Sequence, residues 1–218
     1  MPELIPSKVI DDVVLVRPDV HGDERGRFVE TYRRSWFPDR PEMIQGNRSE
    51  KQAGAVVGLH FHLHQADYWY ALRGRVRVVL HDLRVGSRTD GATEVIELDG
   101  DVDQGVYIPP GVAHGFSSLT DILLTYLVDN YYDDSDEHGL AWDDPTVGAD
   151  WGVTDPILSK RDQGNPGRDD IPDDIRPRLS SGSPARPRSG PARPSRVPRS
   201  RPGFREPRSR YNQPRSSC

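Results

Sequence analysis

Cysteine and long apolar runs are almost absent from this chain of 218 residues. The single cysteine, Cys218, is the last residue, so neither an intrachain disulfide nor a site built from several thiolates can form. No stretch approaches the roughly 18 to 20 apolar residues of a membrane span, and the first residues lack the layout of a signal peptide. We therefore expect a cytoplasmic protein without a membrane partner, whose chemistry uses histidine, carboxylates, tyrosine, lysine or arginine.

Helical periodicity is missing as well, because no long segment repeats its apolar residues every three to four positions. Short β-rich runs alternate instead with turn residues such as Asp-Gly and Pro-Pro-Gly. The runs cover residues 13–17, 27–32, 56–62, 67–72, 75–84, 93–98, 105–108 and 122–128. This pattern predicts an antiparallel all-β domain with few, short helices, closed as a sandwich, a jelly roll or a small barrel.

Charge is divided unequally along the chain. Residues 176–218 contain twelve arginines and one acid, about +11, whereas the remainder has 17 basic and 33 acidic residues, about −16. The basic segment is rich in proline, serine and arginine, a composition that cannot offset the entropy lost on ordering. We expect one domain over residues 1–175 and a disordered tail over residues 176–218. A solvated tail is favoured over an arm that binds nucleic acid, so no nucleic-acid partner is expected.

Histidines cluster in two places. His60, His62 and His64 alternate along a predicted strand, where alternate residues share a face if the strand runs straight. His114 follows a rigid Pro-Pro-Gly turn and opens another strand. Because a tight hairpin is expected at residues 73–75, both clusters are predicted to line one mouth of a barrel.

A series of motifs, in order along residues 8 to 165, resembles the dTDP-4-dehydrorhamnose 3,5-epimerase family. They are DERGRFVE at 23–30, GLHF at 58–61, IPPGVAHGF at 108–116, Tyr126 with Tyr132, EHGLAWDDP at 137–145, Asp150 with Trp151, and LSKRD at 158–162. The resemblance implies a double-stranded β-helix of the cupin jelly-roll type and a homodimer. It also implies an enzyme that epimerises a nucleotide-linked 4-keto-6-deoxy sugar at C3, C5 or both, without a metal or other cofactor.

The resemblance further implies roles for particular residues. Epimerisation needs a base that removes a proton next to the keto group and an acid that returns one to the opposite face. By motif, His60 matches the base, Asp162 its orienting partner and Tyr126 the acid. The matches for substrate binding are Arg25, Phe28 and Glu30 beside the nucleotide, Asn47 in the sugar site and His114 near the carbonyl.

Two residues depart from the family pattern. Asp67 stands where the family has a lysine close to the sugar carbonyl, and an anion there would repel a developing enolate. Val57 stands where the family has an arginine that faces the diphosphate. The loss of that arginine should weaken nucleotide binding or transfer it to another residue.

Two other functions stay open. His60, His62, Asp67 and His114 follow the spacing of metal-binding cupins, with aspartate in place of the usual glutamate, which fits a metal-dependent oxygenase or isomerase. The other is a module that binds a sugar nucleotide without catalysis, in which Asp67 and Val57 replace residues that the reaction needs.

Overall fold

The computed structural model describes residues 1–179 of the chain, so most of the predicted tail, residues 180–218, lies outside the described residues. The described part continues four residues beyond the predicted domain end at residue 175. Arg176 forms an ion pair of 2.7 Å with Asp90, and the N–H of Leu179 donates to the carbonyl of Val85. These contacts attach the start of the basic segment to the domain.

The described residues form two main sheets and a separate hairpin. The strands are β1 Glu3–Pro6, β2 Val14–Arg17, β3 Val20–Asp23, β4 Gly26–Val29, β5 Gln45–Lys51, β6 Val56–Phe61, β7 Asp67–Arg73, β8 Arg75–Asp82, β9 Thr93–Asp99, β10 Gly105–Ile108, β11 Val112–Ser118, β12 Ile122–Val128 and β13 His138–Gly139. The 3-10 turns are η1 Arg34–Trp36, η2 Asp134–Asp136, η3 Asp162–Gly164 and η4 Arg168–Asp170. Within residues 1–179 there is no helix long and apolar enough to cross a membrane.

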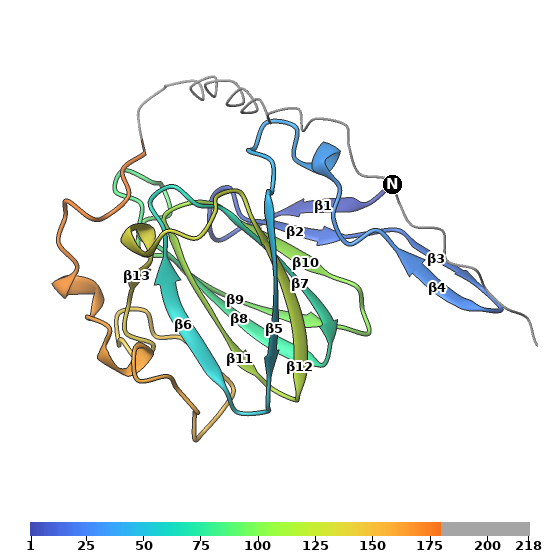
Figure 1. Ribbon diagram of the computed structural model, residues 1–218. Helices are drawn as coiled ribbons and strands as arrows, with labels where there is room; N and C mark the ends of the chain where they lie inside the picture. The colour runs from blue at the N-terminus through green and yellow to red at the C-terminus, as the bar shows by residue number, and fades with distance from the viewer. Residues whose placement is uncertain (180–218) are drawn as a thin grey trace, which may run out of the picture. The chain divides into compact units, whose positions relative to one another are not determined.

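The two sheets lie face to face (Figure 1). One has six strands in the order β1-β2-β10-β7-β12-β5, and the other has five in the order β13-β6-β11-β8-β9. All pairings between these strands are antiparallel, and strands distant in sequence are neighbours, as β10 is of both β2 and β7. This arrangement confirms the all-β jelly roll expected from the sequence.

The main apolar core lies between the sheets. β7 contributes Trp69 and Ala71, and β8 contributes Val76, Val78 and Leu80, all of them buried. The alternation along β8 follows from the period of two of a strand. Since burial of one large apolar side chain stabilises a fold by about 1.5 to 3 kcal/mol, this layer is the main source of stability.

The outer faces of both sheets are covered too. Leu140 and Trp151, which follow β13 in the chain, pack with Phe61 of β6 on the five-stranded sheet. On the six-stranded sheet, Phe37 packs on Tyr68 with a ring separation of 5.8 Å. Because both faces are covered here, β10 and β11 are buried along their whole length, whereas β5 and β9 keep alternating exposed positions.

The hairpin of β3 and β4 pairs with neither sheet. In Figure 1 it extends to the right of the sandwich. An ion pair of 2.8 Å between Arg27 and Asp103 holds it to the loop between β9 and β10. Phe28 is 65% exposed on this hairpin, so a large apolar ring lies open at the surface.

A buried histidine, His81, links β8 to β9 and to the C-terminal segment. Its Nε2 accepts from Arg168 Nε at 3.0 Å, and its Nδ1 donates to the Thr93 hydroxyl at 2.9 Å. That hydroxyl donates to the carbonyl of Val147 at 2.8 Å. Burial and then the charge of Arg168 lower the pKa of His81 to about 4, so the ring is neutral at pH 7.

The low pKa of His81 predicts part of the acid sensitivity of the fold. When the pH falls from about 6.5 towards 4, His81 binds a proton in the unfolded chain but stays neutral in the folded protein. The free energy of unfolding therefore decreases over this range, and the contribution present above pH 6.5 is lost. We expect the free energy of unfolding, measured in urea at pH 7 and at pH 4.5, to fall less in His81→Asn than in the parent. The control is the same substitution at the exposed His21, His21→Asn. If the free energy of unfolding of His81→Asn fell between pH 7 and pH 4.5 as much as that of the parent, the prediction would be wrong.

Candidate active site

A cavity of about 430 Å³ opens between the two sheets. Strand β5 lines one wall with alternate side chains, Gln45, Asn47, Ser49 and Lys51, all of them polar. β6, β11 and β12 supply most of the remaining walls. The cavity therefore puts groups that form hydrogen bonds along the whole of β5, where apolar core would otherwise lie.

His60 lies in this cavity between two carboxylates. Its Nε2 is 2.7 Å from Asp162 Oδ1, and its Nδ1 is 3.5 Å from Glu137 Oε1. Burial alone would raise the pKa of Asp162, but the hydrogen bond and charge of His60, with bonds from Ser159 and the Gly58 backbone, hold the pKa of Asp162 below its ordinary value. Because ionised Asp162 can only accept, Nε2 of His60 donates to it. In the neutral ring the lone pair is then on Nδ1.

Close backbone approach places His60 opposite His114 on the neighbouring strand. The two histidines are paired in register between β6 and β11. Gly58 has a φ of +100°, and a Cβ there would lie 2.8 Å from the carbonyl oxygen of His114. Glycine is therefore required at position 58 of the GLHF motif.

Tyr126 enters the cavity from the other sheet. It lies on β12, in register with Asn47 of β5 and Trp69 of β7. Burial first, and then the charges of Asp67 and Glu137, raise the pKa of Tyr126. The phenol thus keeps its proton at neutral pH, and it lines the cavity from the sheet opposite His60.

His62, Asp67 and His114 form a second buried group in the same cavity. One ligand atom from each lies within 4.8 Å of the others. Burial lowers the pKa of His114 to about 4; the charge of Asp67 acts in the opposite direction, and His62 adds to the lowering. His114 is therefore neutral at pH 7, because the effect of burial outweighs the charge of Asp67, whose Oδ2 lies 3.9 Å from His114 Nε2.

The structure separates the residues predicted to bind substrate. Asn47 and His114 line the cavity with His60 and Tyr126. Arg25 and Phe28 line a different surface depression, on the β3–β4 hairpin. Glu30 forms an ion pair with Arg33 and lines neither. His64, the third histidine of the predicted row, lies beyond the end of β6 and outside the cavity wall.

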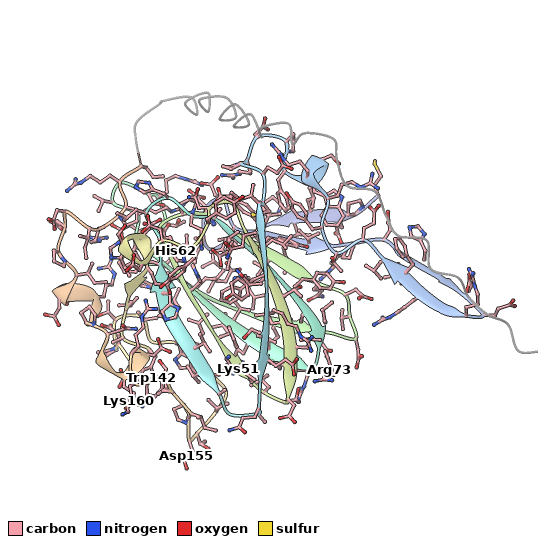
Figure 2. All side chains as sticks on the ribbon, in the orientation of Figure 1. Lys51, His62, Arg73, Trp142, Asp155 and Lys160 are labelled. Atoms are coloured by element: carbon pink, nitrogen blue, oxygen red, sulfur yellow. The ribbon has the colours of Figure 1, made fainter. Side chains whose placement is uncertain are left out.

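Among the cavity residues that were not predicted from the sequence, two carry a charge. Glu137 contacts His60 and is held by Arg161 at 3.0 Å; its place at the start of the EHGLAWDDP motif was the available signal. Lys51 lines the cavity with Val57, and in the described part of the chain it makes no ion pair. Figure 2 shows Lys51 at the lower end of β5 and His62 near the upper end of the sandwich.

The cavity has a histidine hydrogen-bonded to an aspartate on one wall and a protonated tyrosine on the opposite wall. A base and an acid arranged in this way are the groups that a proton-transfer enzyme requires. Together with the two facing sheets, this arrangement places the protein among enzymes built on the cupin double-stranded β-helix.

Comparison with known proteins gives the family. The family described as dTDP-4-dehydrorhamnose 3,5-epimerase matches residues 7–170, and the chain belongs to this family. A protein of that name from Sinorhizobium fredii is 37% identical over 175 residues, which cover 76% of this chain and 90% of the relative. A Streptomyces niveus protein named dTDP-4-dehydrorhamnose 3-epimerase is 38% identical over 162 residues, covering 71% and 78%.

A solved structure supports the same assignment. The epimerase from Legionella pneumophila, in complex with dTDP-4-keto-L-rhamnose, superposes with a TM-score of 0.78 at 28% identity. The match covers 83% of this chain and all of the Legionella chain. The two chains therefore share the whole jelly roll.

Proposed function

We propose that this protein epimerises a nucleotide-linked 4-keto-6-deoxy sugar at C3, C5 or both. The observation that carries the proposal is the cavity in which His60, paired with Asp162, and Tyr126 stand on opposite sheets. Relatives named as 3,5-epimerases and as a 3-epimerase support the substrate class and leave the number of inverted carbons open.

The reaction follows from the two groups. Nδ1 of His60 removes the proton from the carbon next to the C4 keto group, and the electron pair moves onto the keto oxygen to form an enolate. Asp162 accepts from Nε2 and stabilises the imidazolium. As the enolate collapses, Tyr126 donates its proton to the opposite face of that carbon, and solvent then returns a proton to the tyrosinate while His60 releases the other.

The first test is incubation of the protein with dTDP-4-keto-6-deoxyglucose in D₂O, with and without added divalent metal, followed by NMR. We expect deuterium at C3, at C5 or at both, together with the inverted sugar. Absence of deuterium in both conditions would refute the epimerase. Tight binding of the nucleotide sugar without exchange would instead identify a binding module.

Lys51 is the residue we propose to bind the diphosphate. It lines the same cavity as Val57, the position at which the sequence lacks an arginine. Because a hydrogen bond to a charged group contributes about 1.5 to 3 kcal/mol, Lys51→Ala should raise KM about 10- to 100-fold, with a smaller effect on kcat. Exposed Lys8→Ala is the control. An unchanged KM in Lys51→Ala would place diphosphate binding elsewhere.

We also propose a homodimer. Arg25 and Phe28, which the sequence assigns to the nucleotide, lie on a hairpin outside the cavity of their own chain, and Phe28 is largely exposed. A second copy would bury that ring and bring the hairpin to a cavity. Sedimentation equilibrium should give the mass of two chains, whereas an active monomer would refute this arrangement.

A cytoplasmic location is also part of the proposal, because the substrate would be drawn from the cellular nucleotide pool.

A further inference from the structure

Three buried side chains in the cavity wall point their polar atoms at one another. His62 is 6% exposed, Asp67 3% and His114 5%. One nitrogen of each imidazole and one carboxylate oxygen lie within 4.8 Å of one another. The imidazole rings of the two histidines have centroids 5.3 Å apart, and His114 Nε2 is 3.9 Å from Asp67 Oδ2.

The backbone fixes the orientation of both imidazoles. His62 Nδ1 donates to the carbonyl of Asp136 at 2.8 Å, and His114 Nδ1 donates to the carbonyl of Val112 at 2.9 Å. In the neutral rings each Nε2 then carries a lone pair. A hydrogen bond from the remote ring nitrogen to a carbonyl is the usual support of a metal-binding histidine.

The carboxylate of Asp67 is fixed in the same way. Its Oδ1 accepts from Gln65 Nε2 at 2.9 Å, and its Oδ2 accepts from Trp69 Nε1 at 2.9 Å. The Nε2 lone pairs of His62 and His114 and a carboxylate oxygen of Asp67 therefore lie close together, and no hydrogen-bond donor of the described residues lies between them. Such a group of acceptors needs a cation, a proton or a donating water among them, and of these a metal ion satisfies all three ligand atoms at once.

We propose that His62, Asp67 and His114 bind one divalent transition metal ion. Two imidazoles and one carboxylate are a ligand set that iron, manganese, zinc and related ions accept while keeping positions open. Bonds of about 2.0 to 2.2 Å place neighbouring ligand atoms roughly 3 to 3.5 Å apart, so the side chains need to close by about 1 Å. His60 is left out of the set because it does not belong to the group of mutually close ligand atoms, and its Nδ1 lies beside Glu137.

The metal has a function that rests on the proposed epimerisation. His62, Asp67 and His114 all line the cavity, so an ion held by them would be accessible to the keto oxygen of the sugar and would supply Lewis-acid stabilisation of the enolate. Asp67 then serves as a metal ligand, and the ion supplies the positive charge that the lysine supplies in the family pattern. This departs from the expectation, drawn from the resemblance, of a metal-free site.

Metal binding is tested without reference to activity. The full-length protein is stripped with a chelator and titrated with Co²⁺, followed by visible absorption and by calorimetry. We expect one ion per chain, with affinity at least about 100-fold lower in His62→Gln and in Asp67→Asn, a larger loss than removal of an outer hydrogen bond causes. His64→Gln, two residues from His62 but outside the cavity wall, should bind as the parent does.

The outcomes separate the metal site from the proposed reaction. Stoichiometric Co²⁺ in the parent and His64→Gln, lost in both ligand variants that still unfold cooperatively, supports the site. No stoichiometric Co²⁺ in the parent, or an equal loss in His64→Gln, overturns it. Equal deuterium exchange in stripped and metal-loaded protein overturns the Lewis-acid role. Bound Co²⁺ without exchange under any condition supports the site and refutes the epimerase.

Discussion

Replacement of His60 by asparagine is expected to lower the rate of deuterium incorporation into the keto sugar by about 10²- to 10⁴-fold, the range typical of a lost general base. The reason is that His60 lines the cavity, and its bond from Nε2 to Asp162 leaves the ring lone pair on Nδ1. The measurement is the NMR exchange rate at C3 and C5 with saturating substrate.

His64→Asn is the matched control for this experiment, because it removes an imidazole four residues further along the chain from a position outside the cavity wall. The control should exchange at the parental rate. Parental exchange in His60→Asn would assign the proton abstraction to another group, and Glu137, 3.5 Å from His60, would be the first candidate.

Replacement of Tyr126 by phenylalanine is expected to separate exchange from inversion. His60 can still remove a proton and return one to the same face, so deuterium should enter the sugar while formation of the inverted product falls by at least about 100-fold. The raised pKa of Tyr126 keeps the phenol protonated in the parent, which is the state an acid requires. One NMR time course measures both quantities.

Tyr131→Phe is the control for Tyr126, because Tyr131 is 72% exposed and does not line the main cavity. Product formed at the parental rate by Tyr126→Phe would show that water or another side chain protonates the opposite face. Loss of exchange together with inversion would mean that Tyr126 positions the sugar rather than protonating it.

Much of the fold could be predicted from apolar alternation, and one of the strands that the predicted runs omit is informative. Val76, Val78 and Leu80 alternate with less apolar positions, so β8 was predictable. β5 was not, because its sequence QGNRSEK has no large apolar residue. Its inward side chains face a cavity rather than the core, so the hydrophobic signal of a strand is missing where substrate is proposed to bind.

The site was predictable only in part. His60 and Asp162 are 102 residues apart, so no local pattern joins them, and the motif resemblance alone placed them together. The surroundings of Asp67 depend on hydrogen bonds from Gln65 and Trp69 that spacing does not reveal. Arg25 and Phe28 lie outside the cavity of their own chain, so the nucleotide role expected of them rests on the proposed homodimer, which one sequence does not reveal.

The contacts of residues 176–179 have a practical consequence for shortened forms of the protein. Composition places the end of the domain at residue 175, but the next residues contact it. Arg178 forms a parallel β-bridge with Val85, and the carbonyl of Pro177 accepts from the Val85 N–H. Arg176 and Arg168 both form ion pairs with Asp90. A chain cut at 175 would leave those backbone groups to water. The trimming point that preserves the described contacts lies after Leu179, and proteases acting on the intact protein should spare the peptide bonds before it.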